Sequence, residues 1–267
     1  MRKLTFAAVA AVAAFTGQAV AADMAVKAVR PAPVVAAVSW TGCYLGGGGG
    51  YGLFNQQNTQ YLDGPPRVQL VESFDTGGRG WFGTVQAGCD YQFGLGAQQF
   101  VIGAQADYDF ASIRGNHVDS GPQGIGLVAR EKLTDQWAVG GRVGWLALPS
   151  LLTYFSAGYT EALFGRQDYT NLAGPPFGIP QGIYTGSRWY KGWYLGAGDE
   201  YALGFMPGLF WKTEYRFSRM DSANNPLIFT AGNVPVGFSD DTRTYIHTVR
   251  SELVYRFNWG SPVVAKY

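Results

Sequence analysis

The sequence predicts an all-β fold: an eight-stranded antiparallel transmembrane β-barrel with four long extracellular loops and three short periplasmic turns. Three observations lead to this fold class. Eight segments alternate apolar or aromatic residues with glycine or charged residues, and this period of two is that of a β-strand. The connections between these segments are alternately long and short. Glycine and aromatic residues are abundant, with 38 Gly, 17 Phe, 16 Tyr and 8 Trp in 267 residues, which suits twisted, closely packed strands with aromatic girdles.

The clearest alternation lies in residues 192–217, GWYLGAGDEYALGFMPGLFWKTEYRF. One parity of its second arm is mainly aromatic, while the other carries Lys212, Glu214 and Arg216. Residues 203–208 contain two glycines and a proline, so the two arms form a β-hairpin with a tight connection. An apolar face and a charged face fit either a soluble sandwich, with the charged face in water, or a membrane barrel, with the charged face in the lumen.

The remaining segments follow the same pattern along the chain. The predicted strands outside the central hairpin are residues 40–52, 81–93, 99–111, 136–146, 151–163 and 244–257. The long connections are residues 53–80, 112–135, 164–190 and 219–243, and the short ones are residues 94–98, 147–150 and 203–208. Strict segregation of long and short loops, with about ten to thirteen residues per strand, is typical of an outer-membrane barrel and has no purpose in a sandwich. The membrane barrel is therefore favoured.

The N-terminus has the three parts of a secretory signal peptide. Arg2 and Lys3 precede an apolar run that is too short to span a bilayer, and a small-residue cleavage site ends at Ala21. We expect a signal peptide at residues 1–21, a flexible leader at 22–39, the barrel at 40–257 and a C-terminal tail at 258–267. The formal net charge of the whole chain is only +1, so no basic field is present that would attract nucleic acid.

Charged residues on the lumen parity form the candidate site. An internal network of ion pairs would plug a narrow barrel, because buried charges persist only when they are paired and hydrogen-bonded. A selectivity ring in a conducting pore is the alternative, but eight strands leave a lumen that side chains can fill. The predicted network consists of Asp107, Asp109, Arg142, Glu200, Lys212, Glu214, Arg216, Arg250 and Glu252, with Arg256 on the same parity of the last strand.

Several segments together resemble the small alphaproteobacterial outer-membrane β-barrel proteins, the porin-like or outer-membrane immunogenic protein family. WTGCYLGGGGGYG at residues 40–52 resembles the start of those barrels, and GTVQAGCDYQFG at residues 83–94 resembles their second strand. The hairpin at residues 192–217 and the ending VRSELVYRFNWGSPVVAKY are similar to family segments in the same order. The resemblance implies an outer-membrane location, insertion by the outer-membrane assembly machinery and contact with outer-membrane lipid and lipopolysaccharide.

Cys43 and Cys89 are predicted to face outward from adjacent strands. They would lie opposite each other if Trp40 and Gln92 were level, and the periplasm permits a disulfide. A shift of register in the barrel would instead leave two free, lipid-facing thiols, which we take as the default. The spacing of the cysteines and histidines matches no metal site.

The chain contains two histidines, His117 in the second long loop and His247 near the outer end of the last strand. The family resemblance implies a candidate hemin contact at these residues, although exposed, unliganded histidines are the simpler interpretation. A catalytic Ser–His–acid set is poorly supported, since His247 and Ser251 share only an outward face. We therefore expect no enzyme activity and no cofactor.

The predicted function is a structural or surface-interaction role in the outer membrane, with the lumen largely plugged by ion pairs. Long loops over a rigid barrel suit recognition of host or other surface ligands. The alternatives are a porin for small solutes and a hemin-binding surface protein. A nucleic-acid partner is not expected.

Overall fold

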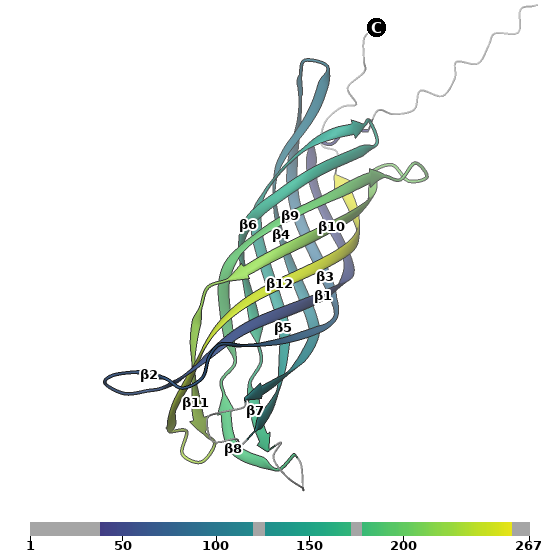
Figure 1. Cartoon of the computed structure of the whole chain (residues 1–267). Helices are drawn as coiled ribbons and strands as arrows, with labels where there is room; N and C mark the ends of the chain where they lie inside the picture. Colours follow the sequence, from purple (N-terminus) through teal and green to yellow (C-terminus); the bar gives the residue numbers. More distant parts are fainter. Residues whose placement is uncertain (1–37, 120–125, 172–177, 258–267) are drawn as a thin grey trace, which may run out of the picture. The chain divides into compact units, whose positions relative to one another are not determined.

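The computed structural model describes residues 38–119, 126–171 and 178–257. The predicted signal peptide, almost all of the leader and the C-terminal tail lie outside the described residues. The structure contains only β-strands among its regular elements there (Figure 1). Their bounds are β1 Gly42–Leu62, β2 Val68–Gln69, β3 Phe74–Leu95, β4 Gln98–Asp119, β5 Leu127–Leu148, β6 Leu151–Phe164, β7 Gln167–Asn171, β8 Pro180–Thr185, β9 Arg188–Ala202, β10 Leu209–Met220, β11 Ala223–Phe229 and β12 Pro235–Phe257.

Eight of these strands close into a ring, which confirms the predicted fold class. The order around the ring is β1, β3, β4, β5, β6, β9, β10 and β12, every neighbouring pair is antiparallel, and β12 pairs with β1 to complete it. The connections from β3 to β4, β5 to β6 and β9 to β10 are short and lie at the end where β1 begins and β12 ends (Figure 1). This end is the periplasmic one in an outer-membrane barrel, and it points upward in Figure 1.

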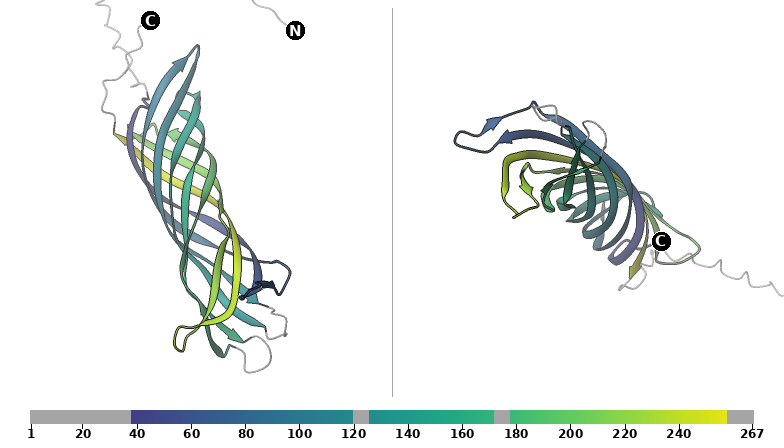
Figure 2. Two further views of the ribbon diagram at one scale, coloured as in Figure 1. Left: turned by 90° about the vertical axis from the view of Figure 1, so that its left-hand side faces the viewer. Right: turned by 90° about the horizontal axis from the view of Figure 1, so that it is seen from below.

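The ring continues beyond the outer end of the membrane-facing strands. There β7, β8 and β11 follow the lines of β6, β9 and β10 after short breaks, and they pair in the order β5, β7, β8, β11 and β12. The strands β1, β3, β4, β5 and β12 run without a break through both parts, as the side view in Figure 2 shows. Much of the length that separates the membrane strands at this end is therefore itself β-sheet.

The predicted outer ends of the strands were wrong for this reason. The first strand was expected to end at residue 52 but continues to Leu62, and the third was expected to end at residue 111 but continues to Asp119. Residues 55–60, NQQNTQ, are polar on both faces, so no apolar alternation marks them as strand. Backbone pairing nevertheless continues there, because it requires no particular side chain.

The outer face of the ring carries the apolar band expected of a membrane barrel. Large apolar side chains on it are exposed, among them Trp81, Phe155 and Val249. Between Phe93 and Trp81 on β3 the chain advances roughly 40 Å at about 3.3 Å per residue, and a tilt of about 45° turns this into roughly 28 Å of height. That height matches the apolar core of a bilayer. Within the described ranges, no helix is long and apolar enough to cross a membrane.

Candidate functional site in the barrel lumen

The inward parity of the ring carries a buried network of charges. Its periplasmic part joins two arginines to two carboxylates: Arg142 Nη1 lies 2.9 Å from Glu200 Oε2, and Arg142 also donates to Asp90 through Nε at 2.9 Å. Arg256 donates to the same two carboxylates, to Asp90 through Nη1 and to Glu200 through Nη2, both at 2.7 Å. Each carboxylate therefore lies between two guanidinium groups, which satisfies charges that have no access to water.

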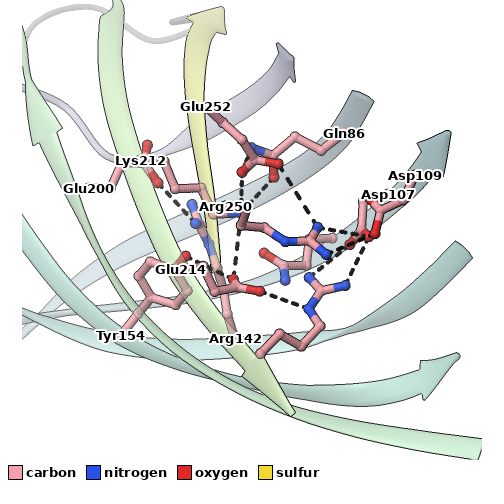
Figure 3. Close-up of polar contacts among 12 residues, drawn as sticks. Gln86, Asp107, Asp109, Arg142, Tyr154, Glu200, Lys212, Glu214, Arg250 and Glu252 are labelled. Atoms are coloured by element: carbon pink, nitrogen blue, oxygen red, sulfur yellow. Dashed lines mark hydrogen bonds and ion pairs between the residues drawn. The ribbon is translucent and has the colours of Figure 1, made fainter. Parts of the chain in front are cut away.

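The central part of the network is built around Lys212 and Glu214 of β10 (Figure 3). Lys212 Nζ lies 3.3 Å from Glu252 and donates to Gln86 Oε1 at 2.6 Å, and Gln86 in turn donates to Glu252 at 2.8 Å. Glu214 accepts a hydrogen bond of 2.8 Å from the Tyr154 hydroxyl. The bonds from Gln86 of β3 and Tyr154 of β6 connect these strands to β10, which is not their neighbour in the ring.

The outer part of the network is centred on Asp107. It accepts two hydrogen bonds from Arg216, at 2.8 and 2.9 Å, and one from Arg250 at 3.1 Å. Arg216 also donates to Glu214 at 2.8 Å, while Arg250 donates to Asp109 at 2.9 Å. Arg216 therefore links the outer and central parts into one network.

Aromatic rings close the periplasmic end of the lumen. Trp40 is fully buried and its indole donates to the backbone oxygen of Pro149 at 3.3 Å. The guanidinium carbon of Arg256 lies 5.1 Å from the Trp40 ring centroid and 5.0 Å from that of Phe210. These contacts hold the rings against the charged network and favour the cation at this position.

An apolar layer lies on the outer side of the network. Every second inward position of β12 shows the order: Arg250 belongs to the network, Ile246 to the apolar layer and Thr242 to a polar group further out, with the buried Thr248 and Thr244 between them. The members of the layer are buried and in contact, and two of its rings, Phe54 and Phe164, meet edge to face with centroids 5.1 Å apart. Its buried members are Phe54, Phe82, Ala111, Ile113, Leu133, Ala162, Phe164, Tyr190, Met220 and Ile246.

A second buried polar group occupies the lumen beyond the apolar layer. His117 Nδ1 lies 3.0 Å from Glu131 Oε1, and its Nε2 lies 4.0 Å from Asp240 Oδ2. Glu131 accepts from the Thr76 hydroxyl at 3.2 Å, and Asn58 donates to the same hydroxyl at 3.0 Å. Asn58, His117, Glu131 and Asp240 line a cavity of about 20 Å³, which is the size of one water molecule.

The structure places every charged residue of the predicted network on the lumen side and buries it. It also places Asp90 in the network, and Glu131 and Asp240 in the second polar group; none of the three was among the predicted site residues. Asp90 shares the parity of Gln86 in a predicted strand, so its signal was present in the sequence. Glu131 and Asp240 lie in segments that were predicted to be loops, where no lumen parity was assigned.

The two histidines lie on opposite faces of the barrel wall. His117 belongs to β4 and is buried in the lumen, contrary to the prediction of a loop histidine. His247 faces outward on β12 and its Nδ1 is 2.7 Å from the Tyr215 hydroxyl. A hemin contact that includes both His117 and His247 is therefore wrong. Within the described residues, no three His, Cys, Asp or Glu side chains are placed to hold a metal ion.

The two cysteines are direct partners across β1 and β3. Cys43 and Cys89 form a disulfide, and their Cα atoms are 3.9 Å apart. The default expectation of two free thiols was wrong because the strands pair without the register shift that would have separated them. This disulfide joins the two strands on their lipid-facing side.

Two curated relatives resemble the chain over almost its whole length. They are the 31 kDa outer-membrane immunogenic proteins of Brucella melitensis and Brucella suis, each 31% identical over an alignment of 264 residues that covers 96% of this chain and 100% of the relative. The chain belongs to the outer-membrane immunogenic protein family. It is thus an outer-membrane β-barrel protein, as the alternation and the sequence resemblance indicated.

Solved structures agree with this assignment at the level of the fold. The outer-membrane protein OprG of Pseudomonas aeruginosa superimposes with a TM-score of 0.52 at 10% identity, over 82% of this chain and 99% of OprG. At this identity the likeness concerns the fold alone. No protein-family model matches the chain.

Proposed function

We propose that this member of the outer-membrane immunogenic protein family is a non-conducting, non-enzymatic surface protein. The observation that carries the proposal is the stacking of two different seals in one lumen, the charged network and the packed apolar layer. Water-filled pores keep their charged rings hydrated. Here the carboxylates and cations of the network bond to one another and are almost completely buried.

The apolar layer supports a closed lumen independently of the charges. An ion that entered from the outside would have to cross a layer in which Ile113, Leu133 and Ile246 are each at most 1% exposed. Apolar constrictions exclude water and thereby block ions. The aliphatic side chains of this layer do not change their charge with pH, so the proposed closure of the lumen holds over a wide range of pH.

The outer end supports a role in surface recognition. It extends the rigid sheet beyond the membrane and carries exposed apolar side chains at its tip, including Val68, Ile179 and Val234. Exposed apolar residues on loops above a rigid scaffold suit contact with partner molecules. The proposed function is therefore to present this outer end while the barrel anchors it and stays closed.

Contacts of the outward His247 agree with the absence of catalysis in this proposal. Its Nδ1 is in contact with the Tyr215 hydroxyl, while the Ser251 hydroxyl accepts a hydrogen bond of 2.8 Å from Trp211. Neither residue contacts the other, and a nucleophilic serine requires a base within hydrogen-bonding distance. A test is to incubate the protein with outer-membrane lipid and analyse the acyl chains, which should remain unchanged.

Conductance tests the closed lumen. The purified protein should insert into planar bilayers without producing stable current steps, and liposomes that contain it should not swell in solutions of small sugars or amino acids. A known porin, inserted in parallel, provides the positive control. Reproducible unitary steps, or swelling that increases with the amount of protein, would refute the proposal.

A further inference from the structure

Three cations lie side by side on the outer face of the barrel wall. Arg79 of β3 is the direct partner of Arg114 of β4, and Arg114 is the direct partner of Lys132 of β5. All three point outward, because their neighbours along the strands, such as Ile113 and Leu133, are buried in the lumen. We call Arg79, Arg114 and Lys132 the basic row. Neighbouring strands are about 4.8 Å apart, so the row concentrates three positive charges on a short arc of the wall.

The basic row has no ion-pair partner among the residues that the structure describes. Across residues 38–119, 126–171 and 178–257, the carboxylates that form ion pairs do so with other cations and with none of Arg79, Arg114 and Lys132. The nearest outward carboxylate on β5 is Asp135, which accepts a hydrogen bond of 3.0 Å from the Tyr108 hydroxyl. Like charges that face each other directly across strands are destabilising. An arrangement of this kind is favourable when an external anion neutralises it.

The position of the row indicates where that anion lies. Trp81, at the outer edge of the apolar band, is 71% exposed and follows Arg79 by two residues on β3, which is the next lipid-facing position toward the periplasm. Aromatic residues mark the level of the lipid headgroups. The basic row begins directly beyond this level, so its charges meet the headgroups of the outer leaflet rather than acyl chains or bulk water.

We propose that the basic row binds the phosphate groups of a phosphorylated glycolipid in the outer leaflet. Guanidinium groups bind phosphate through paired hydrogen bonds, and an ammonium group adds a point charge. The exposed ring of Trp81 lies next to Arg79 on the lipid-facing side of β3, closer to the membrane centre, where the sugar and the upper acyl chains of the same lipid would pack. The site holds one lipid at a fixed place on the barrel, and it requires only the outer-membrane location that the family establishes.

The test compares lipid binding by two variants of the full chain in detergent micelles. One carries Arg79→Gln, Arg114→Gln and Lys132→Gln. The probe is a bis-phosphorylated lipid A, titrated and followed by native mass spectrometry, with the dephosphorylated lipid in parallel. Each basic residue of the row that lies against the bound phosphate groups contributes roughly a factor of five in affinity. The row variant should therefore bind the phosphorylated lipid roughly 100-fold more weakly and the dephosphorylated lipid unchanged.

The matched control variant removes three other outward cations of the same rim. Lys191, Arg219 and Arg243 are exposed and lie on β9, β10 and β12, where none is the direct partner of another. Their replacement by Gln removes the same charge, and it should reduce binding by less than about a factor of five. An equal loss in both variants would show non-specific attraction and would overturn the proposal.

Two further measurements complete the test. Inorganic phosphate at millimolar concentration should not displace the lipid, and displacement would show that the row binds free phosphate instead. Without lipid A, the row variant should unfold at the same or a higher denaturant concentration than the wild type, because like-charge repulsion is removed. A lower midpoint would mean that the three residues stabilise the fold rather than a lipid, and would also overturn the proposal.

Discussion

Replacing Glu214 with alanine removes one carboxylate from the centre of the lumen network. Glu214 is 2% exposed and contacts three side chains: Arg216 Nε at 2.8 Å, the Tyr154 hydroxyl at 2.8 Å and Lys212 Nζ at 3.7 Å. The substitution therefore leaves cations and a hydroxyl in a site without water. Removal of one partner from a buried ion pair costs roughly 3–5 kcal/mol.

The remaining contacts of those cations place the effect at the lower end of this range. Arg216 keeps two hydrogen bonds to Asp107, and Lys212 keeps Glu252 at 3.3 Å and Gln86 at 2.6 Å. We therefore expect Glu214→Ala to lower the free energy of unfolding by about 3 kcal/mol. Glu214→Gln should have a smaller effect, because an amide oxygen still accepts the hydrogen bond from Tyr154.

The assay is urea unfolding in phospholipid vesicles, monitored by tryptophan fluorescence. Thr213→Ala, at the next residue on the lipid-facing parity, is the matched control, and we expect it to change the free energy of unfolding by less than about 0.5 kcal/mol. A double-mutant cycle that combines Glu214→Ala with Arg216→Ala should reveal a coupling free energy between these two residues of up to about 3 kcal/mol. Equal effects of Glu214→Ala and Thr213→Ala would refute the assignment of Glu214 to a buried lumen network.

Three further predictions concern other parts of the molecule. The Arg67 guanidinium donates hydrogen bonds to Asp241 and lowers the pKa of that carboxyl. The stabilisation from this contact is therefore complete above the ordinary Asp pKa of about 3.9 and is lost as the pH falls through the lowered pKa. Arg67→Gln should raise the Asp241 pKa, measured by NMR titration of the carboxyl carbon. Alkylation of the native protein before reduction should label neither cysteine, and reduction of the disulfide should lower the free energy of unfolding by about 2–4 kcal/mol in the same urea assay. Gly50→Ala should reduce the yield of folded barrel in a heat-modifiability gel, because a Cβ atom there would clash with the backbone oxygen of Val249 and the ring of Phe82. Gly47→Ala, on the lipid face, is the control: a Cβ atom there has no neighbouring atom closer than 3.5 Å, so this variant should fold normally.

The sequence by itself determined the fold class and the face on which each membrane residue lies. Lipid accepts only apolar side chains over the whole height of the bilayer, so every second residue of each strand carries the signal. Lys212, Glu214 and Arg216 could therefore be placed in the lumen from their alternation with Trp211, Thr213 and Tyr215. The same local rule separated four long connections from three short ones.

The outer part of the chain could not be predicted in this way. Beyond the membrane the outer face of the strands meets water and the inner face mixes polar groups with a small apolar cluster around Ala129, Tyr169 and Leu227, so the clean alternation disappears although the hydrogen-bonded ladder continues. His117, Glu131 and Asp240 were consequently missed as buried residues, and His117 was assigned to a loop. Only the continued pairing of β4, β5 and β12 around the closed ring shows that these side chains face one another.

Only the tertiary structure decided which residues meet. Asp107 bonds to Arg216 and Arg250, which lie 109 and 143 residues away in the sequence, and Cys43 meets Cys89 across 46 residues. A period of two fixes the face of a side chain, but it contains no information about the offset between neighbouring strands. That offset is set by the shear at which the eight strands close, and every contact across the lumen or between adjacent strands depends on it.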